Sequence, residues 1–255
     1  MKHTWQLVEL EECDSTFTAA RRLSAWTIVA TARQTNGRGR FNRTWFGEAG
    51  GLWMSCNLPL LGDRPWGLLP LVAGAALHRA LAPFGIPGLR LRWPNDLMVR
   101  RGKLAGILVE RSAPDLASVG IGMNVFNSVV SLHGRTTDVP VRLADLVPGC
   151  PPLPQLRNLV VDALAETFDI FVEHGADALL SMLQPVWGAS LPVVAITDDS
   201  RVCGFFDGVK ADGSPILRRA DGTLITVPGI SGPNPLKTAA IASVPPVDAP
   251  IAIIL

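Results

Sequence analysis

The sequence predicts an α/β unit followed by a small β-barrel. Up to about residue 187, short apolar or β-branched segments alternate with three helical segments. From Leu191 onward the pattern changes to short strands, and Asp-Gly dipeptides at Asp212-Gly213 and Asp221-Gly222 separate them. Asp-Gly between alternating segments is a strong hairpin signal. A chain of 255 residues suits one large domain with a small appendage.

The first elements are short. Gln6–Leu10 and Thr27–Thr31 are apolar and partly β-branched, which favours strands. Between them, Asp14-Ser15-Thr16 is typical of a helix N-cap, because short polar side chains accept hydrogen bonds from the first free backbone N–H groups. We expect the first helical turns at Thr18–Leu23 and a further strand at Leu52–Leu58.

The middle of the chain continues the α/β pattern. In Gly67–Leu81 apolar residues recur at helical spacing, and Leu89–Trp93 alternates with period two as a half-buried strand does. Leu104–Val109 and Val119–Asn124 are further strand candidates. A long helix is expected from about Gln155 to Val172, while the segment 126–150 has no chemistry that the sequence assigns.

The C-terminal pattern predicts a small barrel. Its expected strands are Val193–Ile196, Arg201–Val209, Pro215–Arg219 and Leu224–Val227. A unit of about forty residues gains stability by docking on its neighbour. The expected organisation is an α/β domain at 1–187, a barrel at 188–235, and a tail at 236–255 of undetermined structure.

Composition describes a globular protein. Apolar residues make up 48% and charged residues 18%, and the formal net charge of +1 provides no global attraction to nucleic acid or anionic membrane. No apolar run predicts a membrane span, and the N-terminus is unlike a signal peptide, so we expect a cytoplasmic protein. The cysteines have no metal-ligand spacing, which favours free thiols: Cys13, Cys56, Cys150 and Cys203.

The most informative segment is the arginine loop, residues 34–47. It carries Arg38, Arg40 and Arg43 among the glycines Gly37 and Gly39. Ordered glycines cost backbone entropy, so such a loop does not serve stability. Guanidinium groups on a pliable backbone suit a small anion, although a solvated basic turn or a nucleic-acid patch has the same composition.

Three later segments also carry candidate groups. Asp96, after Trp93-Pro94-Asn95, is either a turn former or a ligand for hydrated Mg²⁺ on a nucleotide. Lys103 stands at the entrance of an apolar strand, where it is either a surface residue or a fixed charge facing a ligand. The glycine pair in Gly120-Ile121-Gly122-Met123-Asn124 weakens a strand unless something approaches the backbone closely.

Five motifs, taken in order, resemble those of the biotin protein ligases. They are Asp14-Ser15-Thr16, the arginine loop with Trp45, Trp93-Pro94-Asn95-Asp96, Lys103-Leu104-Ala105-Gly106-Ile107-Leu108, and Gly120-x-Gly122-x-Asn124. The resemblance implies a mixed-sheet catalytic domain of the class II aminoacyl-tRNA-synthetase and biotin-ligase kind, followed by an SH3-like barrel. It also implies ATP and Mg²⁺, biotin as substrate, a biotin carboxyl carrier protein as acceptor, and allows a homodimer.

The resemblance further implies roles for individual residues. Lys103 and Arg40 are the expected catalytic residues, and Asp96 would meet Mg²⁺ through ATP. The expected biotin-binding residues are Ser15, Thr16, Gln34, Gly37, Arg38, Gly39, Arg40, Lys103, Gly106 and Gly122. The expected ATP- and adenylate-binding residues are Arg38, Arg40, Arg43, Trp45, Asn95, Asp96, Lys103 and Asn124.

Some positions depart from the family pattern. Phe17 stands where Asn is usual, Phe41-Asn42 where Arg-Gly is common, and Arg92 where Lys is frequent. A lipoate or octanoate ligase of the same fold, and a non-catalytic biotin-binding homologue, are the alternatives. Strand-like residues begin at Trp5, so we expect neither a preceding helix-turn-helix nor a DNA partner.

Overall fold

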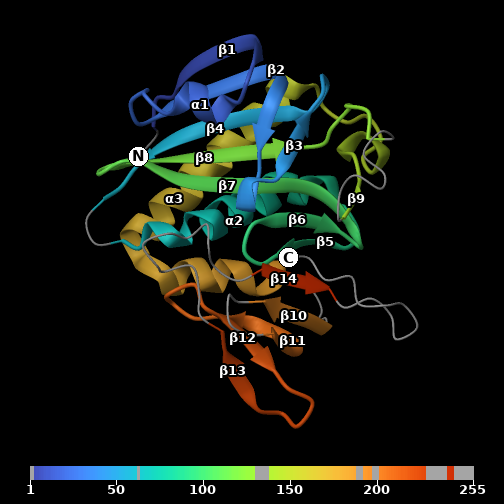
Figure 1. Ribbon diagram of the computed structural model, residues 1–255. Coiled ribbons are helices and arrows are strands. Elements are labelled where there is room, and N and C mark those ends of the chain that lie inside the picture. Colours follow the sequence, from blue (N-terminus) through green and yellow to red (C-terminus); the bar gives the residue numbers. More distant parts are fainter. Residues whose placement is uncertain are drawn as a thin grey trace.

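The computed structural model describes residues 3–61, 64–129, 138–187, 192–196, 201–227 and 240–243. Within these ranges the chain forms a large mixed sheet, helices on one face of it, and a second, smaller sheet (Figure 1). The α/β class predicted from the sequence is confirmed.

The large sheet has nine strands, seven of which follow the order β1-β2-β4-β8-β7-β6-β5, with β3 paired to β2 and β9 paired to β7. The β1–β2 and β7–β9 pairs are parallel and the other pairs are antiparallel, which makes the sheet mixed. The strands are β1 (Gln6–Cys13), β2 (Thr27–Arg38), β3 (Thr44–Gly47), β4 (Leu52–Pro59), β5 (Leu89–Arg92), β6 (Asp96–Val99), β7 (Gly102–Ala113), β8 (Leu116–Met123) and β9 (Val139–Pro140).

The short strands β3, β6 and β9 of the large sheet were not predicted. Strand β2 continues to Arg38, well into the expected loop, because β3 pairs with it from Gln34↔Gly47 to Arg38↔Thr44. Strand β6 begins at Asp96, directly after the turn at Trp93-Pro94-Asn95, and folds back on β5. Four-residue strands carry too few residues for a period-two pattern to be recognised.

The helices are α1 (Thr16–Ala20), α2 (Leu69–Leu81) and α3 (Leu153–Leu183). The predicted N-cap is confirmed, since the Ser15 side chain accepts a hydrogen bond from the Phe17 N–H at 3.3 Å. Helices α2 and α3 cover the same face of the large sheet (Figure 1). This face of β7 and β8 is apolar, and its core residues are Ala105, Ile107, Val109, Val119, Ile121 and Met123.

Helix α2 is strongly apolar. The stretch Trp66–Phe84 is long and apolar enough to cross a membrane, contrary to the expectation from the sequence, but 61% of the qualifying window is buried inside the fold. Ten of the thirteen α2 residues are buried, and the helix packs against α3. Its apolar composition is therefore explained by its place in the protein core.

Helix α3 extends beyond the predicted end near Val172. It is interrupted at Gly175, whose φ of 80° and ψ of −165° are accessible to glycine but strained for other residues. Arg64 donates from Nε to the Val172 carbonyl at 3.1 Å, which satisfies a backbone acceptor next to the interruption. The helical periodicity is lost at this point, so the sequence pattern did not reveal the second part.

The smaller sheet is antiparallel, with the order β13-β12-β11-β10-β14. Its strands are β10 (Pro192–Ile196), β11 (Arg201–Val209), β12 (Pro215–Arg218), β13 (Leu224–Thr226) and β14 (Ala240–Ser243). All four expected strands are present, and β14 adds an edge strand from the tail that the sequence left unassigned. Closure into a barrel is not confirmed, and residues 188–191, 197–200, 228–239 and 244–255 lie outside the described part.

The two sheets meet beside the motif Trp93-Pro94-Asn95-Asp96. The Trp93 indole donates from Nε1 to the Gly213 carbonyl at 3.1 Å, and this bond is buried. Gly213 lies in the turn between β11 and β12 that the Asp-Gly signal predicted. Trp93, which follows β5 of the large sheet, is thus hydrogen-bonded directly to a turn of the smaller sheet.

Candidate active site

A cavity of about 650 Å³ is lined by Gly106, Gly120 and Gly122, which alternate along β7 and β8 with the core residues under α2 and α3, so the cavity lies on the opposite face of the sheet. This volume lies within the range of small-molecule sites. Every expected site residue lines the cavity except Gly37. Gly37 instead allows β3 to approach β2, since a side chain there would meet the Trp45 carbonyl. Expected residues in the lining are Ser15, Thr16, Gln34, Arg38, Gly39, Arg40, Arg43, Trp45, Asn95, Asp96, Lys103, Gly106, Gly122 and Asn124.

Two glycines on neighbouring strands make room for the Trp45 ring. A Cβ atom at Gly106 would lie 2.8 Å from Trp45, and one at Gly122 would lie 2.6 Å from it. Gly106 and Gly122 pair across β7 and β8. The expectation that something approaches the strand glycines closely is therefore confirmed for Gly122, and the approaching group is a side chain of the arginine loop.

A polar cluster lies at the junction of α1 and β2. Gln34 Oε1 accepts from the Thr16 backbone N–H at 2.9 Å and from Thr16 Oγ1 at 3.2 Å. Thr16 Oγ1 also lies 2.9 Å from Ser55 Oγ. Ser55 is fully buried and lines the cavity, but the sequence analysis did not select it. In the sequence Ser55 is marked only as one of two polar residues, with Asn57, in the mainly apolar strand β4.

Phe17, one of the departures from the family pattern, forms an apolar wall here. Its ring is 4% exposed and packs over Gly120, where a Cβ atom would come within 3.1 Å of Phe17 Cδ2. Both residues line the cavity. This position therefore contributes apolar surface to the pocket in place of a polar contact.

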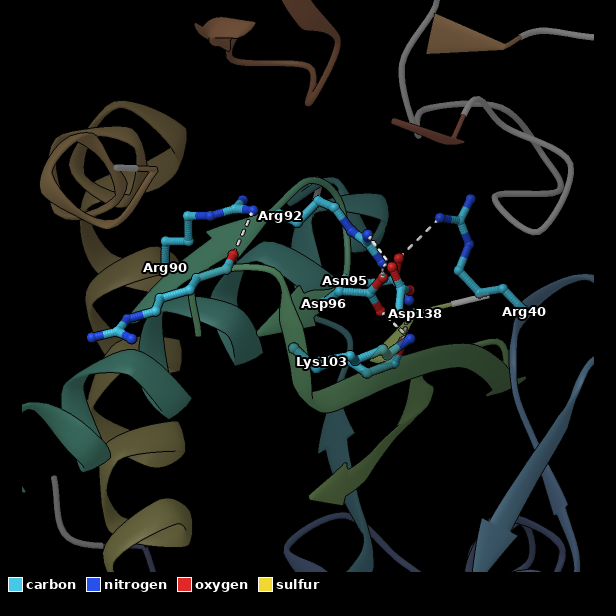
Figure 2. Close-up of polar contacts among 9 residues, drawn as sticks. Arg40, Arg90, Arg92, Asn95, Asp96, Lys103 and Asp138 are labelled. Carbon is cyan, nitrogen blue, oxygen red and sulfur yellow. Dashed lines mark hydrogen bonds and ion pairs between the residues drawn. The ribbon is translucent and has the colours of Figure 1, made fainter. Parts of the chain in front are cut away.

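Four charged side chains in the cavity lining form a cluster with little exposure to solvent (Figure 2). Lys103 Nζ lies 2.6 Å from Asp96 Oδ1, while Arg92 Nη2 lies 2.5 Å from Asp96 Oδ2. Arg92 also donates to both carboxylate oxygens of Asp138, at 2.7 and 2.6 Å. The exposed fractions of the Arg92, Asp96, Asp138 and Lys103 side chains are 10, 12, 16 and 23%. Lys103 Nζ is also 5.3 Å from the Trp45 ring centroid.

Burial and charge oppose each other at Asp96. Burial alone would raise the pKa of Asp96, but the charges and hydrogen bonds of Lys103 and Arg92 outweigh it and lower the pKa to about 2. Burial likewise disfavours the charged form of Arg92, but Asp138 and Asp96 raise its pKa above the ordinary value. Asp96 and Arg92 are therefore both charged at neutral pH.

The arginine loop is connected to this cluster through Arg40. Arg40 Nη1 donates to Asn95 Oδ1 at 3.1 Å, and Asn95 Nδ2 donates to the Ile107 carbonyl at 3.0 Å (Figure 2). Burial lowers the pKa of Arg40 to about 10, partly offset by the negative charge of Asp96, so the group stays cationic at neutral pH. Arg38 lies nearer the rim and pairs with Glu110 at 3.0 Å.

The non-family dipeptide Phe41-Asn42 adopts left-handed backbone conformations, with φ of 56° and 55°. Glycine adopts such angles without the steric cost that other residues incur. The Phe41 ring lies 4.8 Å from the Arg40 guanidinium and 5.7 Å from that of Arg43. Both distances are within the range of cation–π contacts, so the Phe41 ring lies against both guanidinium groups.

The described residues do not form a resident metal centre. Among them, no group of three or more His, Cys, Asp or Glu side chains is placed to hold an ion. Asp96, the expected Mg²⁺ contact, already has one oxygen on Lys103 and the other on Arg92. The residues therefore do not fit a protein-held Mg²⁺, whereas a triphosphate carries its own oxygen ligands for the ion.

The cysteines are free thiols, as expected. Cys56 is completely buried, and burial raises its pKa to about 12, so it is not a thiolate at neutral pH.

Asp96 should contribute to stability in a defined pH range. Its pKa falls from an ordinary value of 3.8 to about 2 on folding, so its contribution is present above about pH 4 and is lost as the pH falls through 2. The shift corresponds to about 2 kcal/mol. We expect urea unfolding to show Asp96→Asn most destabilised at pH 6, with a smaller difference from the unsubstituted protein near pH 2.5. A difference that is independent of pH would contradict this linkage.

Comparison with known proteins supports the resemblance that the five motifs indicated. Residues 13–124 match the model of the biotin/lipoate A/B protein ligase family. A biotin–[acetyl-CoA-carboxylase] ligase of Paracoccus denitrificans is 30% identical over 234 residues, which cover 82% of this chain and 92% of the relative. A Mycobacterium tuberculosis enzyme of the same name is 38% identical over 104 residues, but this match spans only 38% of this chain and 39% of the relative.

Solved structures show the same fold. A biotin protein ligase from Aquifex aeolicus in complex with biotin and ATP superposes with a TM-score of 0.78 at 24% identity, covering 93% of this chain and 99% of that one. The Leishmania major biotin protein ligase in complex with biotinyl-5-AMP gives a TM-score of 0.61 at 24% identity, covering 88% of this chain and 99% of that one.

Proposed function

Since the chain belongs to the biotin protein ligase family, we propose that it activates biotin as biotinyl-5′-AMP and transfers the biotinyl group to a lysine of a biotin carboxyl carrier protein. The observation that carries the proposal is that Lys103, Arg92 and Arg40 line a cavity whose lining also includes aromatic and glycine surface and the polar cluster around Thr16 and Gln34. This combination suits an anionic head group on an apolar body.

The first half-reaction joins two anions. A biotin carboxylate oxygen attacks the α-phosphorus of ATP, a mixed anhydride forms, and pyrophosphate leaves. Fixed cations in a water-poor site lower the barrier, because they stabilise negative charge without reorganising. We propose that Lys103 lies between the carboxylate and the α-phosphate, and that Arg38, Arg40 and Arg43 fold over the adenylate.

The second half-reaction transfers the acyl group. The carrier lysine amine attacks the acyl carbon, the amide bond forms, the amine proton is lost to solvent or buffer, and AMP leaves. We propose that the arginine loop shields the mixed anhydride from water until the carrier protein binds.

The remaining site residues are assigned by similarity. We propose that Ser15, Thr16 and Gln34 bind the biotin end, and that Trp45, Asn95, Asp96 and Asn124 border the nucleotide. Their places in the cavity lining support this assignment. Mg²⁺ would arrive with ATP. The division at about residue 187, an SH3-like closure of the C-terminal sheet, a homodimer and a cytoplasmic location are further parts of the proposal.

Pyrophosphate release tests the proposed activity directly. With ATP, biotin should release pyrophosphate faster than lipoate or octanoate, and labelled biotin should become attached to a carrier domain. Equal or reversed preference would move the chain to the lipoyl branch. Biotin binding without pyrophosphate release would identify a non-catalytic homologue.

A further inference from the structure

We propose that Asp138 is a positioning residue for adenylation, which fixes Arg92 and thereby keeps Asp96 on Lys103. This inference rests on the proposed function. Asp138 lies in the segment 126–150, for which the sequence indicated no chemistry, yet it is in the lining of the cavity and 16% exposed.

The backbone beside Asp138 is attached to the backbone of Lys103. Strand β9 pairs in parallel with the start of β7, with Gly102 opposite Val139 and Lys103 opposite Pro140. The Val141 N–H donates to the Lys103 carbonyl at 3.0 Å. A Cβ atom on Gly102 would lie 2.2 Å from Val141 Cγ1, so the close approach of the two strands requires glycine there. Asp138 is thus held at a fixed position relative to Lys103.

The Asp138 carboxylate binds the fork of Arg92 with two hydrogen bonds, at 2.7 and 2.6 Å. The Nη2 atom of Arg92 also reaches Asp96 at 2.5 Å, so one guanidinium serves two carboxylates. A planar guanidinium with several donors can do this, whereas a lysine ammonium cannot bind a carboxylate with the same bidentate geometry. Asp138 therefore gives a physical reason for arginine at a position where the family often has lysine.

Removing the Asp138 charge should change how Arg92 and Lys103 share the Asp96 carboxylate. The two cations Arg92 and Lys103 balance the two carboxylates Asp96 and Asp138, and without the Asp138 charge the group has an excess positive charge in a poorly solvated place. Arg92 then depends on Asp96 alone and competes with Lys103 for it. Lys103 loses its fixed position, although the attraction of the site for anions does not decrease.

The first test is Asp138→Asn in the full chain, measured by pyrophosphate release with biotin and ATP. Loss of a charge-assisted contact of this kind should lower kcat by about tenfold, while KM for ATP stays within about twofold or falls because the site is more positive. Asp145→Asn is the matched control, since Asp145 also binds an arginine, Arg142, with two hydrogen bonds in the same segment but is 51% exposed. Its kcat should not change. An unchanged kcat in an Asp138→Asn enzyme, or a kcat reduced only by its unfolded fraction, would overturn the proposal.

A double-mutant cycle separates positioning from general destabilisation. Asp138→Asn should cost about tenfold in the presence of Arg92 but less than about twofold in the Arg92→Lys background, because the bidentate interaction is already lost there. Equal costs in both backgrounds would show that Asp138 does not act through Arg92.

A final measurement does not depend on ligase activity. Labelling by an amine-specific acylating reagent, followed by peptide mass spectrometry, should modify Lys103 several-fold faster in Asp138→Asn than in the unsubstituted protein, with exposed Lys210 as the internal standard. An unchanged labelling ratio would overturn the positioning role, even if the unsubstituted chain released no pyrophosphate with biotin and the proposed function itself had failed.

Discussion

Replacing Lys103 with alanine is expected to slow adenylate formation by about 10²–10³-fold, the usual cost of removing one preorganised charge contact in an active site. Lys103 is 2.6 Å from Asp96 and its side chain is 23% exposed, so its position is fixed before any substrate binds. Asp96 keeps Arg92 as a partner when Lys103 is removed, and the fold should therefore survive. Single-turnover pyrophosphate release with saturating biotin and ATP measures the effect.

Two controls make the Lys103 result specific. Lys210→Ala removes an exposed lysine and should leave the rate unchanged. Pre-formed biotinyl-AMP should restore part of the transfer to the carrier in Lys103→Ala, because the second step does not bring two anions together. Near-normal pyrophosphate release by a well-folded Lys103→Ala enzyme would remove Lys103 from this role.

The elements that the sequence predicted correctly have strong local signals. The alternation in Leu89–Trp93, the N-cap at Ser15 and the Asp-Gly turns each depend on neighbouring residues, and each is present in the structure. The glycines Gly120 and Gly122 indicated a close approach to β8, and the side chains of Phe17 and Trp45 make it.

The features that the sequence did not predict depend on contacts between residues far apart in the chain. Arg92 and Asp138 are 46 positions apart, and their ion pair exists only because β9 lies beside the start of β7. Ser55 belongs to the site because β4 places it against Thr16 from α1. The tail strand β14 is recognised by its antiparallel pairing with β10, and the sequence pattern of the tail did not indicate this pairing. The charged cluster in the cavity lining is thus assembled from segments whose pairing no local pattern encodes.

Replacing Arg40 with glycine is expected to release the adenylate rather than to prevent its formation. Arg40 connects the arginine loop to the turn between β5 and β6, because its Nη1 donates to Asn95 Oδ1 at 3.1 Å (Figure 2). Loss of that contact removes a link between the arginine loop and the β5–β6 turn, and glycine at position 40 beside Gly39 adds backbone freedom. A loop that closes less often leaves the mixed anhydride exposed to water and to other nucleophiles.

The measurement is biotin labelling of a bystander protein together with the carrier domain, with labelled biotin and ATP. Arg40→Gly should keep pyrophosphate release but increase bystander labelling at least tenfold relative to carrier labelling. Arg33→Ala is the control, since Arg33 is on the same strand as the start of the loop but forms an exposed pair with Glu12 at 2.8 Å. Its labelling should remain confined to the carrier. An Arg40→Gly enzyme that releases no pyrophosphate would assign Arg40 to the chemical step, and one that labels only the carrier would show that retention of the adenylate does not depend on Arg40.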